Sequence, residues 1–497
     1  MRAGSCDPSV TPTGACEHGG VLNTALPPTK RPIVYWFRRD LRLADSPALV
    51  AAARAAGAEP IVPLFVVDPR AGRGAGPNRW QFLASCLEEL DRQLGGALTL
   101  RRAPGVGGAA AVAAIVAGFA AEVGAEIVVA SGETTPYGRR RDRIVAERLA
   151  AEDRRLLLLD TPYCVAPGRL RRTGGHPYRV FSAFYRAWLA EPVEAPYERP
   201  AARFDALVSD GEATDLVDAA GRGYDVSPSW WRDLPLGPAP HLPAAGERAA
   251  IDRLTQFCES ALPQYDRHRD RPDMAGTSRL SADLHFGTLH PRTVRDAARK
   301  TVEGPALDRF LAELAWREFF ADVLWHRPDA AWHSWDPIGR HLAVDDGPQA
   351  RERFTAWARG ETGYGLVDAG MRQLLSEGWM HNRVRMVSAS FLVKDLHLDW
   401  RWGARWFLWH LVDGDIASNN LNWQWVAGIG TDAAPYHRIF NPDRQAERFD
   451  PDGAYRRRYC ADLPARLSIV NHKAERAEAL TRWAAAKAAV RHESTAD

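Results

Sequence analysis

The sequence predicts a chain of two unlike domains: an N-terminal α/β domain with a parallel sheet, and an all-helical C-terminal domain joined to it by a long linker. Before residue 163, short apolar runs alternate with helical stretches, which is typical of a parallel sheet covered by helices. After residue 246, apolar residues recur at helical spacing. The length of 497 residues also exceeds what one hydrophobic core usually supports.

The N-terminal domain is predicted from four strand-like runs with helical stretches between and after them. The first helix is introduced by Asp45-Ser46-Pro47, where a capping side chain precedes proline at the first helical position. The glycines between 72 and 76 follow the second strand, not the first, and so match a dinucleotide phosphate loop poorly. The predicted strands are 33–37, 61–67, 126–130 and 155–159, and the predicted helices are 47–57, 79–95, 108–123 and 138–151.

The remaining chain divides into a linker and a helical domain. Residues 164–245 are rich in proline and glycine, which predicts an interdomain linker. Residues 1–31 are predicted to be a disordered extension, 32–163 the α/β domain and 246–497 the helical domain. The helices predicted in that last domain are 247–262, 291–302, 305–326, 365–377, 380–394, 402–412 and 472–491.

Composition narrows the class of protein. With 46% hydrophobic and 25% charged residues, the chain resembles an ordinary soluble globular protein, and it lacks the long apolar run of a membrane span. The six cysteines are scattered, which predicts reduced thiols in the cytoplasm and no metal centre. A net charge of +2 is too small to indicate nucleic acid by itself. Most basic residues are arginines, which suit phosphate contacts, although GC-rich coding gives the same bias.

A tryptophan-rich stretch near the C-terminus is the most informative part of the sequence. Arginines, asparagines and an Asp-Gly-Asp turn are mixed among its indoles. Because a buried indole N–H needs a partner, such a cluster favours a surface that stacks on flat aromatic ligands, and it offers a path for electrons. The tryptophans are Trp379, Trp400, Trp402, Trp406, Trp409, Trp423 and Trp425.

Two other patterns indicate a ligand site, each with a plainer alternative. Tyr265 lies twelve residues before the segment 277–281, Thr-Ser-Arg-Leu-Ser, whose hydroxyls and amides could cradle a pyrophosphate or merely cap a helix. Glu313, Trp316 and Arg317 share one helix face. Asn382, Arg385 and Met386 repeat that spacing. Each face could line a pocket for a base, or could simply be amphipathic.

Taken together, these motifs resemble the cryptochrome/DNA photolyase family, and most of all its class I cyclobutane pyrimidine dimer photolyases. The resemblance covers about residue 32 to about residue 465, in the family's order and spacing. The opening signature is Trp-Phe-Arg-Arg-Asp-Leu-Arg at 36–42. The other matching motifs are Thr-Ser-Arg-Leu-Ser at 277–281, Glu-Leu-Ala-Trp-Arg-Glu-Phe at 313–319, Gly-Trp-Met-His-Asn-Arg-Val-Arg-Met at 378–386, Asp-Gly-Asp at 413–415, Asn-Asn-x-x-Trp-Gln-Trp at 419–425, Gly-Thr-Asp-Ala-Ala-Pro at 430–435 and Phe-Asn-Pro at 440–442.

The resemblance implies FAD as cofactor. Asn419 would face flavin N5, and an Arg385–Asp413 ion pair would lie beside the ring and favour the anionic reduced state. A second, antenna chromophore of folate or deazaflavin type is implied near residues 131–142, without a motif that selects between them. The residues implied to bind FAD are Tyr265, Thr277, Ser278, Arg279, Leu280, Ser281, Arg385, Asp413, Gly414, Asp415 and Asn419.

The reaction implied by the resemblance is light-driven repair of UV-damaged DNA. Reduced FAD would give an electron to a flipped-out cyclobutane pyrimidine dimer, the dimer would split, and the electron would return. Glu313 would hydrogen-bond a dimer carbonyl as negative charge builds there, and no metal is needed. The implied catalytic residues are Glu313, Asn419, Trp423 and Trp400, and the implied lesion or DNA contacts are Glu313, Trp316, Arg317, Asn382, Arg383, Met386 and Trp425.

Two alternatives remain within the same family. A (6-4) photolyase would carry a second histidine where this chain has Asn382 after His381, so dimer repair is favoured. A cryptochrome-like photosensor would be expected to have a long regulatory tail, whereas about thirty residues follow position 465. We expect a monomer with no obligatory protein partner.

The family's electron path has a third, distal tryptophan, and this chain has Gly347 at the expected position. Trp332, Trp335, Trp402 or Trp406 could replace it.

Overall fold

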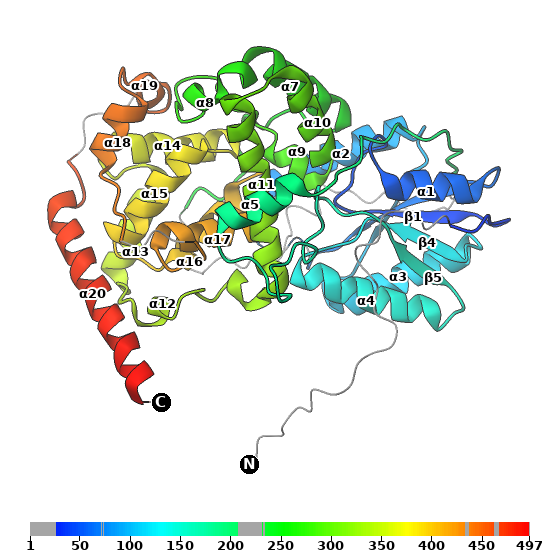
Figure 1. Ribbon diagram of the computed structural model, residues 1–497, viewed down its shortest axis with the longest axis horizontal. Helices are drawn as coiled ribbons and strands as arrows, with labels where there is room; N and C mark the ends of the chain where they lie inside the picture. The colour runs from blue at the N-terminus through cyan, green and yellow to red at the C-terminus, as the bar shows by residue number, and fades with distance from the viewer. Residues whose placement is uncertain are drawn as a thin grey trace.

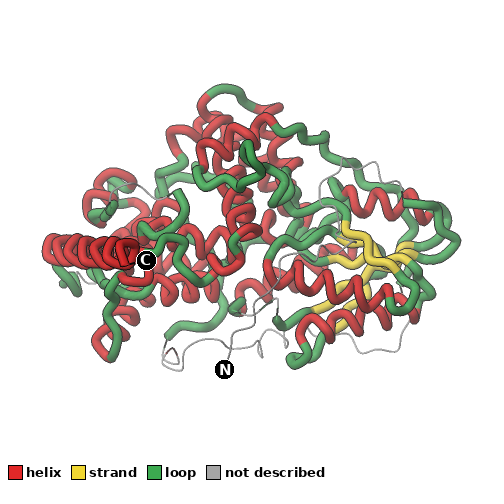
Figure 2. The backbone as a smooth tube through the Cα atoms, turned by 60° about the horizontal axis from the view of Figure 1, so that its bottom comes forward, coloured by secondary structure: helices red, strands yellow, loops and turns green. Residues whose placement is uncertain are grey.

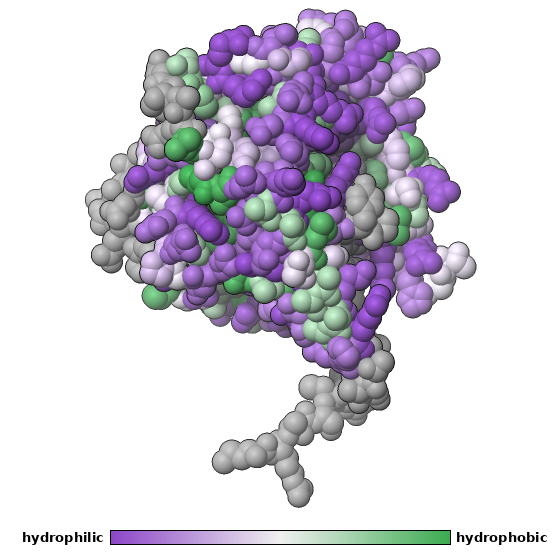
Figure 3. Space-filling model, turned by 90° about the vertical axis from the view of Figure 1, so that its left-hand side faces the viewer, coloured by the Kyte–Doolittle hydropathy of each residue, from purple (hydrophilic) through white to green (hydrophobic). Residues whose placement is uncertain are grey.

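The computed structural model describes residues 26–70, 72, 74–206, 231, 234–432, 437–461 and 467–496. Figure 1 shows a sheet domain at one end and a larger helical domain at the other. The predicted extension 1–31 lies outside the described residues as far as residue 25. Its last residues belong to the α/β domain, because the Thr29 N–H donates to the Ala55 carbonyl at 3.0 Å. The middle of the predicted linker also lies outside the described residues. No described helix has the length and apolarity needed to span a bilayer, and the face that carries α20 is largely hydrophilic (Figure 3).

Five parallel strands form the sheet, in the order β3-β2-β1-β4-β5 (Figure 2). In the central strand, Val34 pairs with Val62 on one side and with Val128 on the other. Strands β1 and β2 are buried along their whole length, because helices cover both faces of the sheet. The strands are β1 (Ile33–Phe37), β2 (Ile61–Val67), β3 (Thr99–Arg102), β4 (Ile127–Ala130) and β5 (Arg155–Leu158).

The predicted α/β architecture is confirmed, with one strand added. Strand β3 was not predicted, because its sequence Thr-Leu-Arg-Arg has little apolar character and it lies at the sheet edge. Ser46 caps the first helix as expected, since its side chain accepts the Leu49 N–H. The helices of this domain are α1 (Pro47–Ala56), α2 (Pro77–Gln93), α3 (Gly108–Glu122) and α4 (Pro136–Ala150).

The C-terminal domain is helical, as predicted, and contains helices that periodicity did not reveal. Helix α17 was missed because three asparagines interrupt its pattern, and asparagine is a weak helix former. The principal helices are α7 (Glu247–Ser260), α9 (Ser281–Phe286), α10 (Pro291–Thr301), α11 (Pro305–His326), α13 (Pro348–Arg359), α14 (Gly365–Glu377), α15 (Asn382–Lys394), α16 (Trp400–His410), α17 (Ile416–Ala427) and α20 (His472–Ala496). Shorter ones are α8 (Tyr265–His268), α12 (Ile338–His341), α18 (Pro442–Phe449) and α19 (Ala454–Cys460).

Part of the predicted linker belongs to the helical core. It contains helix α5 (Phe181–Ala190), which lies against α11 (Figure 1). Trp188 of α5 is fully buried, and its indole N–H donates to Glu318 at 2.7 Å. Further along, Phe204 bridges to Ile61 at the start of β2. The segment therefore packs against both domains over the residues that the structure describes.

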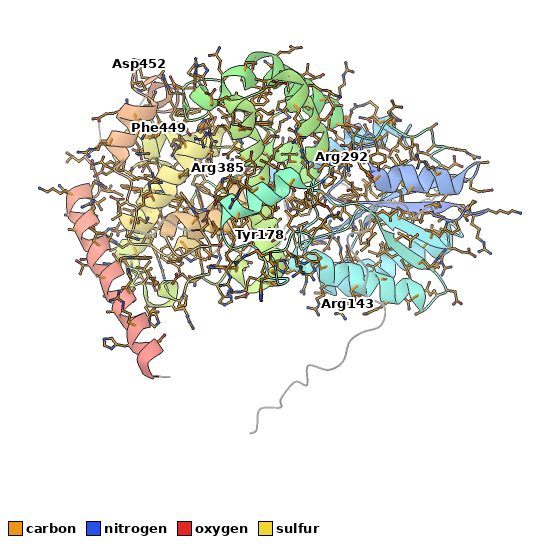
Figure 4. All side chains as sticks on the ribbon, viewed as in Figure 1. Arg143, Tyr178, Arg292, Arg385, Phe449 and Asp452 are labelled. Carbon is orange, nitrogen blue, oxygen red and sulfur yellow. The ribbon has the colours of Figure 1, made fainter. Side chains whose placement is uncertain are left out.

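The two domains meet where the start of α2 contacts the end of α16. The Gly76 N–H donates to the Trp409 carbonyl at 3.1 Å, and Asn78 donates to the His410 carbonyl at 2.6 Å. Arg292 lies between the domains (Figure 4) and donates to Asp45 at 2.8 Å. These contacts fix the sheet domain against the helices that carry the tryptophan-rich stretch.

Gly76→Ala is expected to weaken this contact. An added methyl group would lie 2.2 Å from the Trp409 carbonyl oxygen, a backbone atom that cannot move aside alone. We expect a loss of about 1–3 kcal/mol in the free energy of unfolding, measured by urea denaturation. Gly118→Ala is the matched control, because nothing lies within 4 Å of its added carbon and alanine favours the helix interior by about 0.5–1 kcal/mol. Equal stabilities of the two variants would contradict the role of Gly76.

Candidate active site

A cavity of about 440 Å³ opens in the helical domain, and a smaller one of about 90 Å³ adjoins it. The two share a wall formed by residues such as Asn382, Arg385 and Asp413. The larger cavity is lined by every predicted FAD residue except Gly414 and Asn419, which line the smaller one, and by every predicted lesion residue. Trp423 lines the smaller cavity, whereas Trp400 lines neither cavity.

The floor of the site is the Asp413-Gly414-Asp415 turn between α16 and α17. Arg385 donates to Asp413 at 2.8 Å, which confirms the predicted ion pair. One oxygen of Asp415 accepts the N–H groups of Ala417 and Ser418, at 3.1 and 2.9 Å, and so caps α17. The turn is thus rigid, and it exposes carboxylates to the cavity from the start of a helix.

The sheet domain holds this turn from outside. Arg39, just after β1, donates to the other oxygen of Asp415 at 3.0 Å. Arg79 of α2 donates to the Gly414 carbonyl at 2.8 Å. Burial alone would raise the pKa of Asp415, yet the Arg39 guanidinium holds it well below its usual range. Asp415 is therefore ionised, and it joins the two domains.

His285 completes this group and was not singled out from the sequence. It lines the larger cavity and lies 4.0 Å from Asp415. Burial, assisted by Arg39, lowers its pKa well below the usual range, so the ring is neutral. A single histidine such as His285 leaves no periodic pattern in the sequence, and neither does an arginine of the other domain such as Arg79. Neither residue could therefore be predicted to belong to the site.

The polar groups left over at the cavities fit a cofactor such as FAD. Asp413 Oδ1, His285 Nδ1 and Trp423 Nε1 are buried without a hydrogen-bond partner in the protein. Buried polar atoms in native proteins usually have partners, and a flavin with its ribityl and phosphate groups offers both donors and acceptors. The hydroxyls of Thr277 and Ser278 and the side chain of Tyr265 line the same space.

Asn419 has its amide orientation fixed by its neighbours. Its Nδ2 donates to the Ala404 carbonyl at 3.0 Å and to Asn420 Oδ1 at 2.8 Å. Both partners are acceptors, because Asn420 uses its own Nδ2 to donate to Ala331. Asn419 Oδ1 therefore remains as an acceptor at the smaller cavity.

The lesion side of the cavity contains two aromatic walls and two ion pairs. Trp316 and Trp425 both line it. Glu313 pairs with Arg269 at 2.6 Å, and Arg383 pairs with Asp270 at 2.8 Å. The site therefore presents aromatic faces beside charges that are already partly neutralised.

Arg317 joins the two domains through hydrogen bonds that the sequence did not predict. Its guanidinium donates to the carbonyls of Pro162 and Leu284, at 2.8 and 2.9 Å, and lies over the Tyr163 ring. The donors are thus directed into the protein, where they connect α11 to the end of the sheet domain. Arg317 also lines the larger cavity, and its predicted contact with DNA remains a prediction.

Aromatic rings lead away from Trp423 by a route that the sequence did not suggest. Its ring centroid is 6.2 Å from Trp357. Trp357 is 5.5 Å from Phe354, which is 5.7 Å from the half-buried Trp402. Gly347, at the position predicted for a distal tryptophan, precedes α13 with a φ of 87°.

The segment implied to adjoin an antenna chromophore lies at the carboxyl ends of β1 and β4, where the strand order reverses. Open α/β sheets commonly bind ligands there. In this chain Arg38 pairs with Asp142 at 2.5 Å, and Tyr137 donates to Asp68 at 2.9 Å. The guanidinium carbons of Arg38 and Arg141 lie 4.5 and 4.9 Å from the centre of the Trp36 ring.

Comparisons with known proteins agree with this arrangement. Residues 33–201 match the family model for DNA photolyase, and residues 310–490 match that for the FAD binding domain of DNA photolyase. The chain is 42% identical to the deoxyribodipyrimidine photo-lyase of Streptomyces griseus, over 86% of this chain and 89% of the relative. It is 37% identical to that of Escherichia coli, over 86% and 88%.

Solved structures show the same fold. A bacterial class III photolyase from Agrobacterium tumefaciens aligns with a TM-score of 0.81 and 34% identity, over 94% of this chain and 99% of that one. An archaeal photolyase from Sulfolobus tokodaii with two FAD molecules aligns with a TM-score of 0.74 and 28% identity, over 91% and 99%. The predicted membership of class I remains a prediction.

His381 provides a pH-dependent test of the site. It caps α15 by accepting the Arg383 N–H at Nδ1, and burial lowers its pKa to about 4. Between pH 6.5 and about 4, His381 binds a proton in the unfolded chain but not in the folded protein, so stability is lost as the pH falls. At pH 5 this amounts to about 2 kcal/mol relative to pH 8.

His381→Asn keeps a capping acceptor and removes the titration. Its free energy of unfolding should therefore fall by about 2 kcal/mol less than that of the parent between pH 8 and pH 5. His176→Asn, at an exposed position, is the control and should follow the parent. Parallel pH profiles for the parent and His381→Asn would refute the assignment.

Proposed function

The chain belongs to the DNA photolyase family, and on that premise we propose that it is a deoxyribodipyrimidine photo-lyase, which splits cyclobutane pyrimidine dimers in UV-damaged DNA under light. The observation that carries the proposal is the single cavity in which predicted cofactor residues and predicted lesion residues face one another. An enzyme that transfers an electron directly from cofactor to substrate requires such a shared space.

Bound reduced FAD supplies, on absorbing light, the electron that opens the dimer. The residues of this chain hold and tune it. Tyr265 and the segment 277–281 line the cofactor side of the cavity, and Arg385 places positive charge next to Asp413. Asn419 Oδ1, the acceptor left by its fixed amide, suits a flavin N5 that carries a proton.

The lesion side binds a flipped-out dinucleotide. Trp316 and Trp425 provide flat apolar walls, and unstacking costs least at a damaged step. Glu313 pairs with Arg269, and a carboxylate in such a pair accepts hydrogen bonds. The proposed partner of Glu313 is therefore an imide N–H of the dimer, in place of the dimer carbonyl that the resemblance implied. Arg383 is the proposed basic contact to the DNA strand.

One observation favours dimer repair over (6-4) repair. His381 is 3% exposed, and its Nδ1 is committed to the α15 cap. It also lines neither cavity. Its Nδ1 is therefore not available to transfer a proton to a bound lesion, which is the role that the (6-4) alternative assigns to histidine.

The photosensor alternative stays open to test, because a cryptochrome from Synechocystis also aligns, with a TM-score of 0.75 and 25% identity. We further propose a second chromophore, a cytoplasmic location and a monomer without an obligatory protein partner. The proposed domain limits are those predicted from sequence, with α5 packed as part of the helical body.

The test is repair of a defined substrate. The purified protein is reduced, bound to an oligonucleotide with one thymine dimer, and exposed to blue light. Thymine absorbance should recover in light and stay low in darkness. FAD binding without repair of this substrate would shift the assignment to a photosensor or, if a (6-4) substrate is repaired, to that class.

Glu313→Ala should reduce repair by about ten- to hundredfold, because one hydrogen bond to a charged group is lost. The flavin absorption spectrum should not change. Glu303→Gln, an exposed carboxyl side chain just before α11, is the matched control. An equal loss in both variants would show that bulk charge, and not the Glu313 contact, is responsible.

Photoreduction of FAD tests the aromatic route. We propose that electrons reach the cofactor through Trp423 and Trp357, whose rings are in contact. Trp423→Phe should abolish photoreduction, and Trp357→Phe should slow it, while repair by chemically reduced protein is retained in both. Normal photoreduction in Trp357→Phe together with its loss in Trp400→Phe would restore the route predicted from sequence.

A further inference from the structure

Trp316 is covered from behind by a residue of the predicted linker. The Phe181 ring lies parallel to it, with 3.7 Å between centroids and 8° between planes. Tyr185, one turn further along α5, stacks on Phe181 in the same way at 5.6 Å and 11°. The stack fixes the plane of an indole that lines the cavity, since parallel aromatic contacts resist rotation.

Trp425, the second aromatic wall, is connected to the segment that begins α5. Its indole N–H donates to the Asp432 carbonyl at 3.0 Å. Burial raises the pKa of the Asp432 carboxyl, an effect that the nearby backbone N–H of Phe181 opposes. Thr431 donates its hydroxyl to the Arg179 carbonyl at 2.8 Å. The loop after α17 is thereby joined to the residues that begin α5.

The Asp432 carboxylate, from another part of the chain, lies close to the N-terminus of α5. The first N–H groups of a helix have no partner within it, and the residue before α5, Val180, provides no side-chain cap. A carboxylate at that end is favoured by the helix dipole. Asp432 holds a φ of 53°, a conformation that persists only where surrounding contacts enforce it.

The other end of α5 is anchored to α11. Trp188 donates to Glu318, which also accepts the backbone N–H groups of Cys164 and Val165 at 2.7 and 2.9 Å. Figure 1 shows α5 lying across α11 near α17. Phe181 is therefore carried on a helix that is anchored to α11, which supplies Trp316, and that begins beside the loop following α17, which supplies Trp425.

We propose that Phe181 and Asp432 form a bracket that sets the spacing of the two tryptophan walls, with Phe181 as a positioning residue for the lesion. The inference rests on the proposed function, because a flipped dimer is the ligand for which the spacing matters. Neither residue lines the cavity, so each acts through the tryptophan that it holds.

A first experiment needs no DNA. The protein is labelled with 5-fluorotryptophan, and the resonances of Trp316 and Trp425 are assigned by their loss in Trp316→Phe and Trp425→Phe. Phe181→Leu should shift and broaden the Trp316 signal, and Asp432→Gly should do the same to Trp425. Tyr178→Leu, in the same segment before α5 (Figure 4), is the matched control and should leave both signals in place.

A second experiment measures substrate binding by the same variants. Phe181→Leu should weaken binding of dimer-containing DNA by about two- to tenfold, the contribution of one aromatic stack. Binding of undamaged DNA and the flavin spectrum should not change. Phe181→Tyr should restore affinity because it keeps the ring, and Asp432→Asn should outperform Asp432→Gly because it keeps an acceptor.

The outcomes separate this inference from the proposed function. Unchanged fluorine signals in Phe181→Leu and Asp432→Gly would overturn the bracket, whatever the protein repairs. Altered signals with unchanged affinity for the dimer would overturn its role in positioning the lesion. If the parent repairs no dimer at all, the proposed function fails, while the fluorine signals still decide whether the bracket exists.

Discussion

The partly buried carboxylate of Asp415 makes the interactions on which the arrangement of the site depends. One of its oxygens caps α17 and the other binds Arg39 of the sheet domain. A charge removed from water without a partner is costly. The α17 cap, the turn and the contact with Arg39 therefore depend on one another. The sheet domain, beyond any role in collecting light, is thus a structural support for the flavin side of the cavity.

Helix α11 supports the lesion side of the cavity, as Asp415 supports the flavin side. One face lines the cavity with Glu313 and Trp316. The other is buried against the segment between the domains, where Glu318 and Asp322 accept backbone N–H groups, the latter from Gly168 at 2.7 Å. Burial raises the pKa of Asp322 to about 6, so this acceptor is sensitive to mild acid. The walls of the lesion pocket are consequently coupled to a segment at the C-terminal end of the residues that match the family model for DNA photolyase.

Most arginines near the site are committed to the protein itself. Arg39, Arg79 and Arg317 donate to carboxylates or carbonyls across the domain boundary. Their guanidinium groups can satisfy several acceptors at once, which a lysine could not do in the same geometry. Many of the arginines therefore stabilise the contact between the domains and are not reserved for DNA. A small net charge is compatible with the proposed substrate, because only the few arginines at the cavity need to contact the DNA.

The sequence by itself determined the two-domain fold class, nearly all strands, and most residues of the cavity, because periodic burial and closely spaced motifs are local properties of the chain. It did not determine what lies behind those residues. Phe181 against Trp316, Arg79 on Gly414 and Trp357 beside Trp423 join positions far apart in sequence. Such contacts leave no periodic signal, so only tertiary packing decided which side chains hold the site in place.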